Sequence, residues 1–214
     1  MSRAYQVSES GLVPSLNGIL ADIQDRLDQL QGLRGVTTTE SNVVTTGAMY
    51  ASVMFPSQAI VPIGGGSDPG RDTTTGYLEF DGSSTESIAG ACLMPRSWKE
   101  GSVVSPVVHW GKTTSATGTV QWEWRYRYHD MGRTITSWSD WFPATAEVPD
   151  GDTADRHARA DMPNITLSAI TGALLHWQLR RVGGSDTYAA DAQLYAFALN
   201  IQIDRLGSST EFAA

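Results

Sequence analysis

The chain has 214 residues, a formal net charge of -8, 41% hydrophobic residues, seven Trp and seven Tyr. No block of Lys or Arg forms a stripe that could bind phosphates, so nucleic acid is not an expected partner. The single cysteine, Cys92, excludes an intrachain disulfide and a cysteine-rich zinc site. The sequence shows neither a signal peptide nor a run of roughly 18 apolar residues, so neither secretion nor a membrane partner is expected.

The first domain segment, residues 1–35, contains a regular apolar seam. Spacings of three and four residues separate Val13, Leu16, Leu20, Ile23, Leu27 and Leu30, which is the a/d pattern of a heptad repeat. This pattern predicts a helix over 16–33 that is about 27 Å long. An isolated helix of this length is marginal in water, so its apolar stripe needs a partner surface.

Two partner surfaces are open to this helix. It could pack on the second part of the same chain, or it could form a short coiled coil between copies. The regular seam favours the coiled coil, so the predicted oligomerisation residues are Leu16, Leu20, Ile23, Leu27 and Leu30. Leucine dominates the seam and no polar residue interrupts it, which favours a homotrimer.

The periodicity changes after the helix. Residues 36–46 are polar and β-branched, which predicts an extended linker. Residues 47–214 follow the period of two that is typical of strands. The clearest strand is 119–128, whose aromatic face is made by Trp122, Trp124, Tyr126 and Tyr128. We expect this face to lie in the core, and the alternative is a platform that stacks against sugars.

Further strands and turns are spread evenly over the second part. Residues 130–133 form a turn, after which 135–142 can return as a partner strand. Other strands are predicted at 77–80, 103–110, 174–182 and 193–203, the last with Tyr195, Phe197, Leu199, Ile201 and Ile203 on one face. Strands without alternating helices predict an all-β fold, a jelly-roll-like antiparallel β-sandwich preceded by the short α-helix.

No catalytic, cofactor-binding or metal site is predicted. His109 and His176 each precede a Trp in a strand pattern and are interpreted as ordinary strand residues. Glu79 and Asp81 could form an acid/base pair, but nothing else marks a cleft, so an enzyme is not expected. The acidic turn with Asp150, Asp152 and Asp155 could hold calcium, although a solvated turn is the preferred interpretation.

Two other segments invite a functional interpretation. Gly111, Lys112 and Thr113 look like the end of a phosphate loop, but Pro106 occupies the place of the first glycine, so a hairpin turn is predicted. The polar stretch 143–163 is expected to be one long loop, and an interface with another subunit is favoured over a catalytic lid.

Several separated pieces of the chain resemble virion structural proteins of tailed bacteriophages and prophages. The matching pieces are 93–102 (Leu-Met-Pro-Arg-Ser-Trp-Lys-Glu-Gly-Ser), 107–110 (Val-Val-His-Trp), 117–122 (Thr-Gly-Thr-Val-Gln-Trp), 186–192 (Asp-Thr-Tyr-Ala-Ala-Asp-Ala) and 203–212. These pieces occur in this chain in the same order as in the phage proteins, over about residues 77–212. The resemblance implies a β-sandwich particle protein on the head or in the tail, often trimeric, and it carries no catalytic motif.

The preferred function is therefore structural. The chain is expected to be a head-decoration, head-fibre or tail-associated protein of the virion, made in the cytoplasm of the bacterial host. Its expected partners are its own copies and other capsid or tail proteins. The alternative is a glycan-binding jelly-roll module of a phage tail or receptor-binding apparatus, whose partner is a host glycan. A glycan-degrading enzyme is the least favoured reading.

The leucine seam predicts the outcome of a double substitution. Leu20→Asp combined with Leu27→Asp places two charges in the seam, so oligomers should be lost while the β-fold stays intact. Light scattering measures the mass in solution, and circular dichroism checks the strands. An unchanged mass would contradict the assignment of the seam.

Overall fold

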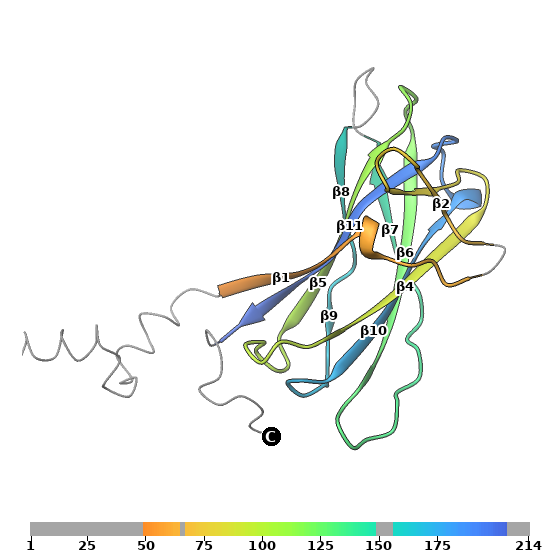
Figure 1. Cartoon of the computed structure of the whole chain (residues 1–214). Coiled ribbons are helices and arrows are strands. Elements are labelled where there is room, and N and C mark those ends of the chain that lie inside the picture. The colour runs from red at the N-terminus through yellow and green to blue at the C-terminus, as the bar shows by residue number, and fades with distance from the viewer. Residues whose placement is uncertain (1–48, 65–66, 149–155, 205–214) are drawn as a thin grey trace, which may run out of the picture. The chain divides into compact units, whose positions relative to one another are not determined.

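The computed structural model describes residues 49–64, 67–148 and 156–204, and these form a β-sandwich of two antiparallel sheets (Figure 1). This confirms the predicted all-β sandwich. The predicted helix, the linker and the seam residues Leu16, Leu20, Ile23, Leu27 and Leu30 lie outside the described residues. Among the residues that are described, no helix is long and apolar enough to cross a membrane.

The large sheet has seven strands. They are β1 (Met49–Pro56), β2 (Gly70–Arg71), β3 (Leu78–Phe80), β5 (Val103–Lys112), β8 (His157–Asp161), β9 (Ile165–Thr166) and β11 (Ala192–Ile203). The strand order is β2-β3-β11-β5-β8, with β1 also beside β11 and β9 also beside β5. The long strand β11 therefore organises this sheet, because three other strands pair with it.

The small sheet has four strands in the order β4-β10-β6-β7. They are β4 (Thr85–Leu93), β6 (Thr119–His129), β7 (Phe142–Glu147) and β10 (Leu174–Val182). Short 3-10 turns occur at Ser57–Ala59 and Gly183–Ser185.

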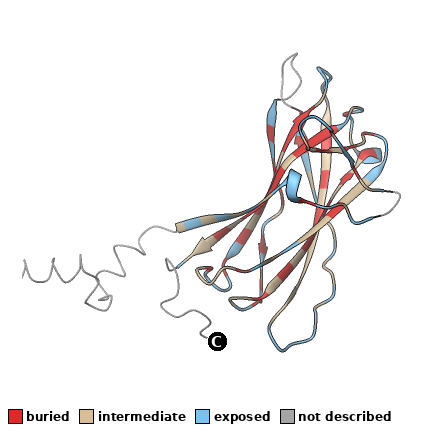
Figure 2. Cartoon of the chain, viewed as in Figure 1, coloured by how far each residue is buried: buried red, intermediate tan, exposed pale blue. Residues whose placement is uncertain are grey.

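The core lies between the two sheets, where buried positions alternate along the strands (Figure 2). Trp122 and Trp124 are fully buried, while Tyr126 and Tyr128 are partly buried and pack against the same core. The predicted aromatic face of this strand is thus confirmed as core rather than as a sugar platform. Alternation places the polar residues of β6 on the outer face of the small sheet.

The predicted return strand at 135–142 is wrong, because β7 begins only at Phe142. Residues between the turn and β7 still follow the edge of β6. The backbone N–H groups of Thr136 and Ser139 donate to the carbonyls of Tyr128 and Tyr126 at 3.1 and 2.8 Å. In return, the two hydroxyls accept from the backbone N–H groups of those tyrosines. Side chains thus replace part of the ladder that a strand would form.

Two further predictions need correction. Residues 143–163 are not one loop, because they contain most of β7 and all of β8. The buried positions of these two strands carry only alanine, at Ala146, Ala158 and Ala160. Alanine is only weakly hydrophobic, so the sequence shows no clear period of two in these strands. Gly111 and Lys112 belong to β5 rather than to a hairpin turn, and Lys112 is fully buried. The acidic residues Asp150, Asp152 and Asp155 lie outside the described residues.

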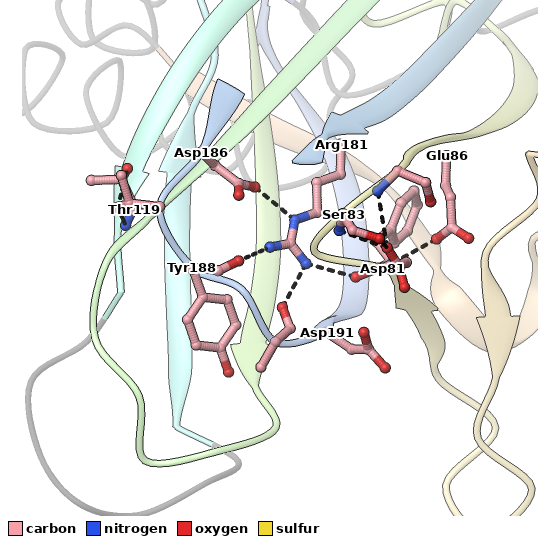
Figure 3. A network of polar contacts seen from close by, with 12 residues as sticks. Asp81, Ser83, Glu86, Thr119, Arg181, Asp186, Tyr188 and Asp191 are labelled. Carbon is pink, nitrogen blue, oxygen red and sulfur yellow. Dashed lines mark hydrogen bonds and ion pairs between the residues drawn. The ribbon is translucent and has the colours of Figure 1, made fainter. Parts of the chain in front are cut away.

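A fully buried arginine ties together one end of the sandwich (Figure 3). Arg181 Nε donates to Asp186 Oδ2 at 2.8 Å, and Nη1 donates to the carbonyls of Phe80 and Ala190 at 2.7 and 2.8 Å. Its Nη2 donates to the carbonyl of Tyr188. These contacts join the end of β10 to the last residue of β3 and to the segment that leads into β11, so Arg181 acts as a buried cross-link.

Removing this cross-link should be costly. Arg181→Met leaves the buried carboxylate of Asp186 without its cation, which is expected to destabilise the fold by about 3–5 kcal/mol. Urea denaturation measures the free energy of unfolding. Adding Asp186→Asn removes the stranded charge and should restore part of the loss, whereas Arg159→Met, which breaks an exposed pair, should change stability little. Equal midpoints for Arg181→Met and Arg159→Met would contradict this role.

Candidate functional site

A row of rings crosses the outer face of the large sheet. Its members are Tyr77 just before β3, Tyr195 on β11, His157 on β8 and His109 on β5, and we call them the ring row. Ring centroids lie 4.8 Å apart for Tyr77 and Tyr195, 5.9 Å for Tyr195 and His157, and 5.1 Å for His157 and His109. Residues from four separate stretches of the chain therefore form one continuous surface.

Two irregularities of the sheet place Tyr195 in this row. The pairing of β11 with β5 shifts between Leu194 and Ala196, so the register skips Tyr195, whose side chain turns to the outer face. The expectation that Tyr195 shares a face with Phe197 is therefore wrong. One extra residue in the strand reverses the alternation, and Leu194 and Phe197 both point into the core.

Gly111 is the second irregularity. Tyr195 reaches across β5 and covers this glycine, so that a Cβ at position 111 would lie 2.0 Å from the tyrosine hydroxyl oxygen. No other residue type fits beneath the ring without moving it. His157 pairs directly with Gly111 in the ladder, which explains why the tyrosine ring reaches the imidazole.

Polar groups flank the ring row at both ends. Beside the tyrosines, Gln193 Nε2 donates to Glu79 Oε1 at 3.0 Å and lies 3.5 Å from Asp72 Oδ2. Beside the histidines, Arg159 and Asp161 form an exposed ion pair at 2.5 Å. The row thus combines flat apolar faces with carboxylate, amide and guanidinium groups that can bond to hydroxyls.

An open depression of about 630 Å³ adjoins the histidine end of the row. Arg159 and Asp161 line it together with Pro143, Thr145 and Asn164. The same ion pair therefore borders both the row and the depression, and a ligand longer than the row has space to continue there.

The two carboxylates considered as an acid/base pair have separate partners. Glu79 accepts from Gln193, whereas Asp81 Oδ1 accepts from the backbone N–H groups of Ser83 and Ser84 at 2.6 and 2.9 Å. The hydroxyl and N–H of Ser83 chiefly lower the pKa of Asp81. Asp81 is thus engaged in closing a turn, and Glu79 belongs to the surroundings of the ring row.

Strand register brings the histidines together in two pairs. His109 Nδ1 lies 3.0 Å from His157 Nε2, and the rings of His129 and His176 stack with centroids 4.6 Å apart. Burial lowers the pKa of His109, and so do the neighbouring His157 and Arg159, while Asp161 opposes them. Burial also lowers the pKa of His176, with smaller contributions from His129 and Arg127. No spacing in the sequence could reveal these pairs, because they join different strands.

Neither histidine pair by itself supplies the three or more protein ligands that hold a metal ion in a typical site. Within the described parts of the chain, no group of three or more His, Cys, Asp or Glu residues gathers where it could hold a metal ion. His109 and His176 are strand residues, as expected.

The outer face of the small sheet carries a stack of alternating arginines and tryptophans, which we call the Arg–Trp ladder. Arg127 and Arg125 lie over Trp138 with guanidinium carbons 4.6 and 5.0 Å from the ring centroid. Arg125 and Arg180 lie over Trp141 at 4.5 and 3.9 Å. Guanidinium groups thus occupy the ring faces of both tryptophans, so these rings are not available to stack on a sugar.

Comparison with protein-family models gives no match, and comparison with curated proteins gives none either. Among solved structures, an isomalto-dextranase from Arthrobacter globiformis T6 in complex with panose is 19% identical, with a TM-score of 0.40 over 69% of this chain and 23% of that chain. The CBM35 of Cellvibrio japonicus Abf62 is 11% identical, with a TM-score of 0.38 over 75% of this chain and 100% of that chain.

The CBM36-1 domain of a multidomain xylanase from the hindgut metagenome of Trinervitermes trinervoides is 10% identical, with a TM-score of 0.39 over 70% of this chain and 96% of that chain. The chain spans about a quarter of the isomalto-dextranase.

The lowered pKa values of His109 and His176 predict a loss of stability in mild acid. The unfolded chain, with an ordinary histidine pKa of 6.5, takes up protons before the folded chain does. This contribution to stability is complete above pH 6.5 and is lost as the pH falls from there through the lower folded-state pKa values.

Urea titrations at neutral pH and in mild acid measure this effect. The variant with His109→Gln and His176→Gln should lose less stability on acidification than the unaltered protein, because glutamine does not titrate. The same pH dependence in both proteins would show that other groups cause it.

Proposed function

We propose that the β-sandwich is a glycan-binding module and that the ring row is its binding surface. The observation that carries this proposal is the placement of Tyr195, which a bulge turns outward and which Gly111 lets lie across the strand. Bulges are commonly used to redirect a side chain at a functional surface. Packing of the core requires neither the bulge in β11 nor the glycine at position 111, because the buried side chains of these strands pack on the other face of the sheet.

Sugar chemistry suits this surface. Sugar rings have flat apolar faces and hydroxyl-bearing edges, so they fit aromatic side chains whose surroundings donate and accept hydrogen bonds. The tyrosine end offers Glu79, whose carboxylate is held by the buried Gln193, and the histidine end offers Arg159 and Asp161. The Arg–Trp ladder is a poorer platform because cations occupy its ring faces.

The setting that we propose for this module is a phage particle. The leucine seam would gather several copies, and several weak glycan sites on one assembly bind a host surface more strongly than a single site does. A purely structural role on the head or tail is the second candidate. The observation that favours it is the ordered sequence resemblance over residues 77–212, and recovery of the chain from purified particles by mass spectrometry would support it.

Glycan binding predicts the effect of three substitutions. Screening the full chain on a glycan array identifies a ligand, and calorimetry then measures its affinity. Tyr195→Ala should lower the affinity about tenfold, which corresponds to roughly 1.4 kcal/mol. Gly111→Ala should have a similar effect because its methyl group displaces the ring.

Trp141→Ala, on the opposite sheet, is the matched control and should leave this affinity unchanged. Near-ultraviolet circular dichroism confirms that each variant is folded. The proposal fails if no glycan binds, or if Tyr195→Ala binds as well as the unaltered chain.

A further inference from the structure

We propose that the Arg–Trp ladder is a second binding surface, one that takes an anionic polysaccharide through its carboxylate or sulfate groups. The ladder lies on the small sheet, so this inference does not rest on the ring row. Its five side chains, Arg127, Trp138, Arg125, Trp141 and Arg180, are half-buried and form one continuous stack.

Charge is unbalanced along the ladder. Glu123 accepts from Arg180 Nε at 2.8 Å and also from Gln121 at 3.1 Å, so the carboxylate at this end is engaged. Arg125 donates through Nε to the neutral Gln178 at 2.7 Å. Within the described residues no carboxylate forms an ion pair with Arg125 or Arg127. Two cations on this face thus have no ion-pair partner in the described part of the chain, although the net charge of the whole chain is -8.

The like charges also affect one another. Partial burial lowers the pKa of Arg125, and the neighbouring Arg180 and Arg127 lower it further. An oxyanion bound beside these guanidinium groups would relieve that repulsion. Clusters of like charges that lower one another's pKa in this way are typical of sites that bind a ligand of opposite charge.

Stacking prepares the arginines for such a ligand. The tryptophan rings hold the guanidinium planes in place, so less side-chain freedom is lost when an anion binds. The planar guanidinium matches carboxylate and sulfate oxygens with two parallel hydrogen bonds. The Nη groups of Arg125 remain for this purpose, because its hydrogen bond to Gln178 uses Nε. Arg127 stacks on Trp138 through the plane of its guanidinium group, which leaves the edge of that group for hydrogen bonds to an anion.

The neighbouring surface favours a polysaccharide over other polyanions or a protein. Ser87 and Ala89 of β4 pair with Arg180 and Gln178, so a floor of small residues lies beside the ladder. A protein partner would bury a large apolar anchor at the centre of the face, but the two tryptophans there are already stacked against guanidinium groups and the adjoining strand carries small residues. Single-stranded nucleic acid binds by stacking bases on aromatic rings, and here arginines cover the ring faces.

The test uses the full chain with heparin as the sulfated probe, polygalacturonate as the carboxylated probe and dextran as the neutral control. Single-stranded DNA is the competing polyanion. Calorimetry at low and high salt measures each affinity. Binding to one or both anionic probes is expected, with a loss at high salt, and dextran should not bind at this surface. Arg125→Gln with Arg127→Gln should weaken anionic binding at least tenfold.

Lys99→Gln with Arg133→Gln, which removes two positive charges from exposed positions outside the ladder and the ring row, is the matched control for net charge and should bind almost as the unaltered chain does. Tyr195→Ala should also leave anionic binding intact, so failure of the ring row and failure of the ladder give different results. If the double variant misfolds, Arg127→Gln alone serves, because it removes the arginine at the end of the ladder and leaves the stacking of Arg125 on Trp138 and Trp141 in place.

Three outcomes would overturn the proposal. The first is that neither anionic probe binds at low salt. The second is that Lys99→Gln with Arg133→Gln weakens binding as much as the ladder variant, which would mean attraction by overall charge. The third is stronger binding of single-stranded DNA than of both polysaccharides, which would assign the face to nucleic acid.

Discussion

Packing of aromatic rings between the two sheets is the interaction on which the rest of the structure depends. Trp177 of the small sheet contacts Phe55 and Phe197 of the large sheet, with ring centroids 4.9 and 4.7 Å apart. Burial of such large apolar side chains is the main driving force that holds two sheets together. Since side chains alternate along a strand, this inward packing also decides which residues face outward.

Both proposed surfaces are consequences of that constraint. On β6 and β10 the residues between the buried aromatic and aliphatic ones carry Arg125, Arg127 and Arg180, so these cations share one outer face. On the large sheet the outer face collects the ring row, although Tyr195 reaches it only through the bulge of β11. The sandwich therefore offers two chemically different faces, one of neutral rings with hydroxyl-binding neighbours and one of stacked cations.

Prediction from the sequence succeeded where one signal dominated. Strong alternation located β6, β10 and β11 and identified Trp122 and Trp124 as core residues. It failed at β8, where buried alanines give little apolar contrast. It also failed for 135–142, where the hydroxyls of Thr136 and Ser139 take the place of ladder bonds. The leucine seam, outside the described residues, stays a prediction.

What the sequence determined by itself was the all-β class, the position of most strands and the inward face of β6, because these follow from local periodicity. Only the tertiary structure decided which strands are neighbours and in what register. The pairing of Gly111 with His157, the bulge at Tyr195 and the meeting of Arg125 with Trp141 all depend on that register. Residues that lie far apart in the sequence show no characteristic spacing when they come into contact in the fold. Both candidate surfaces could therefore be identified only from the tertiary structure.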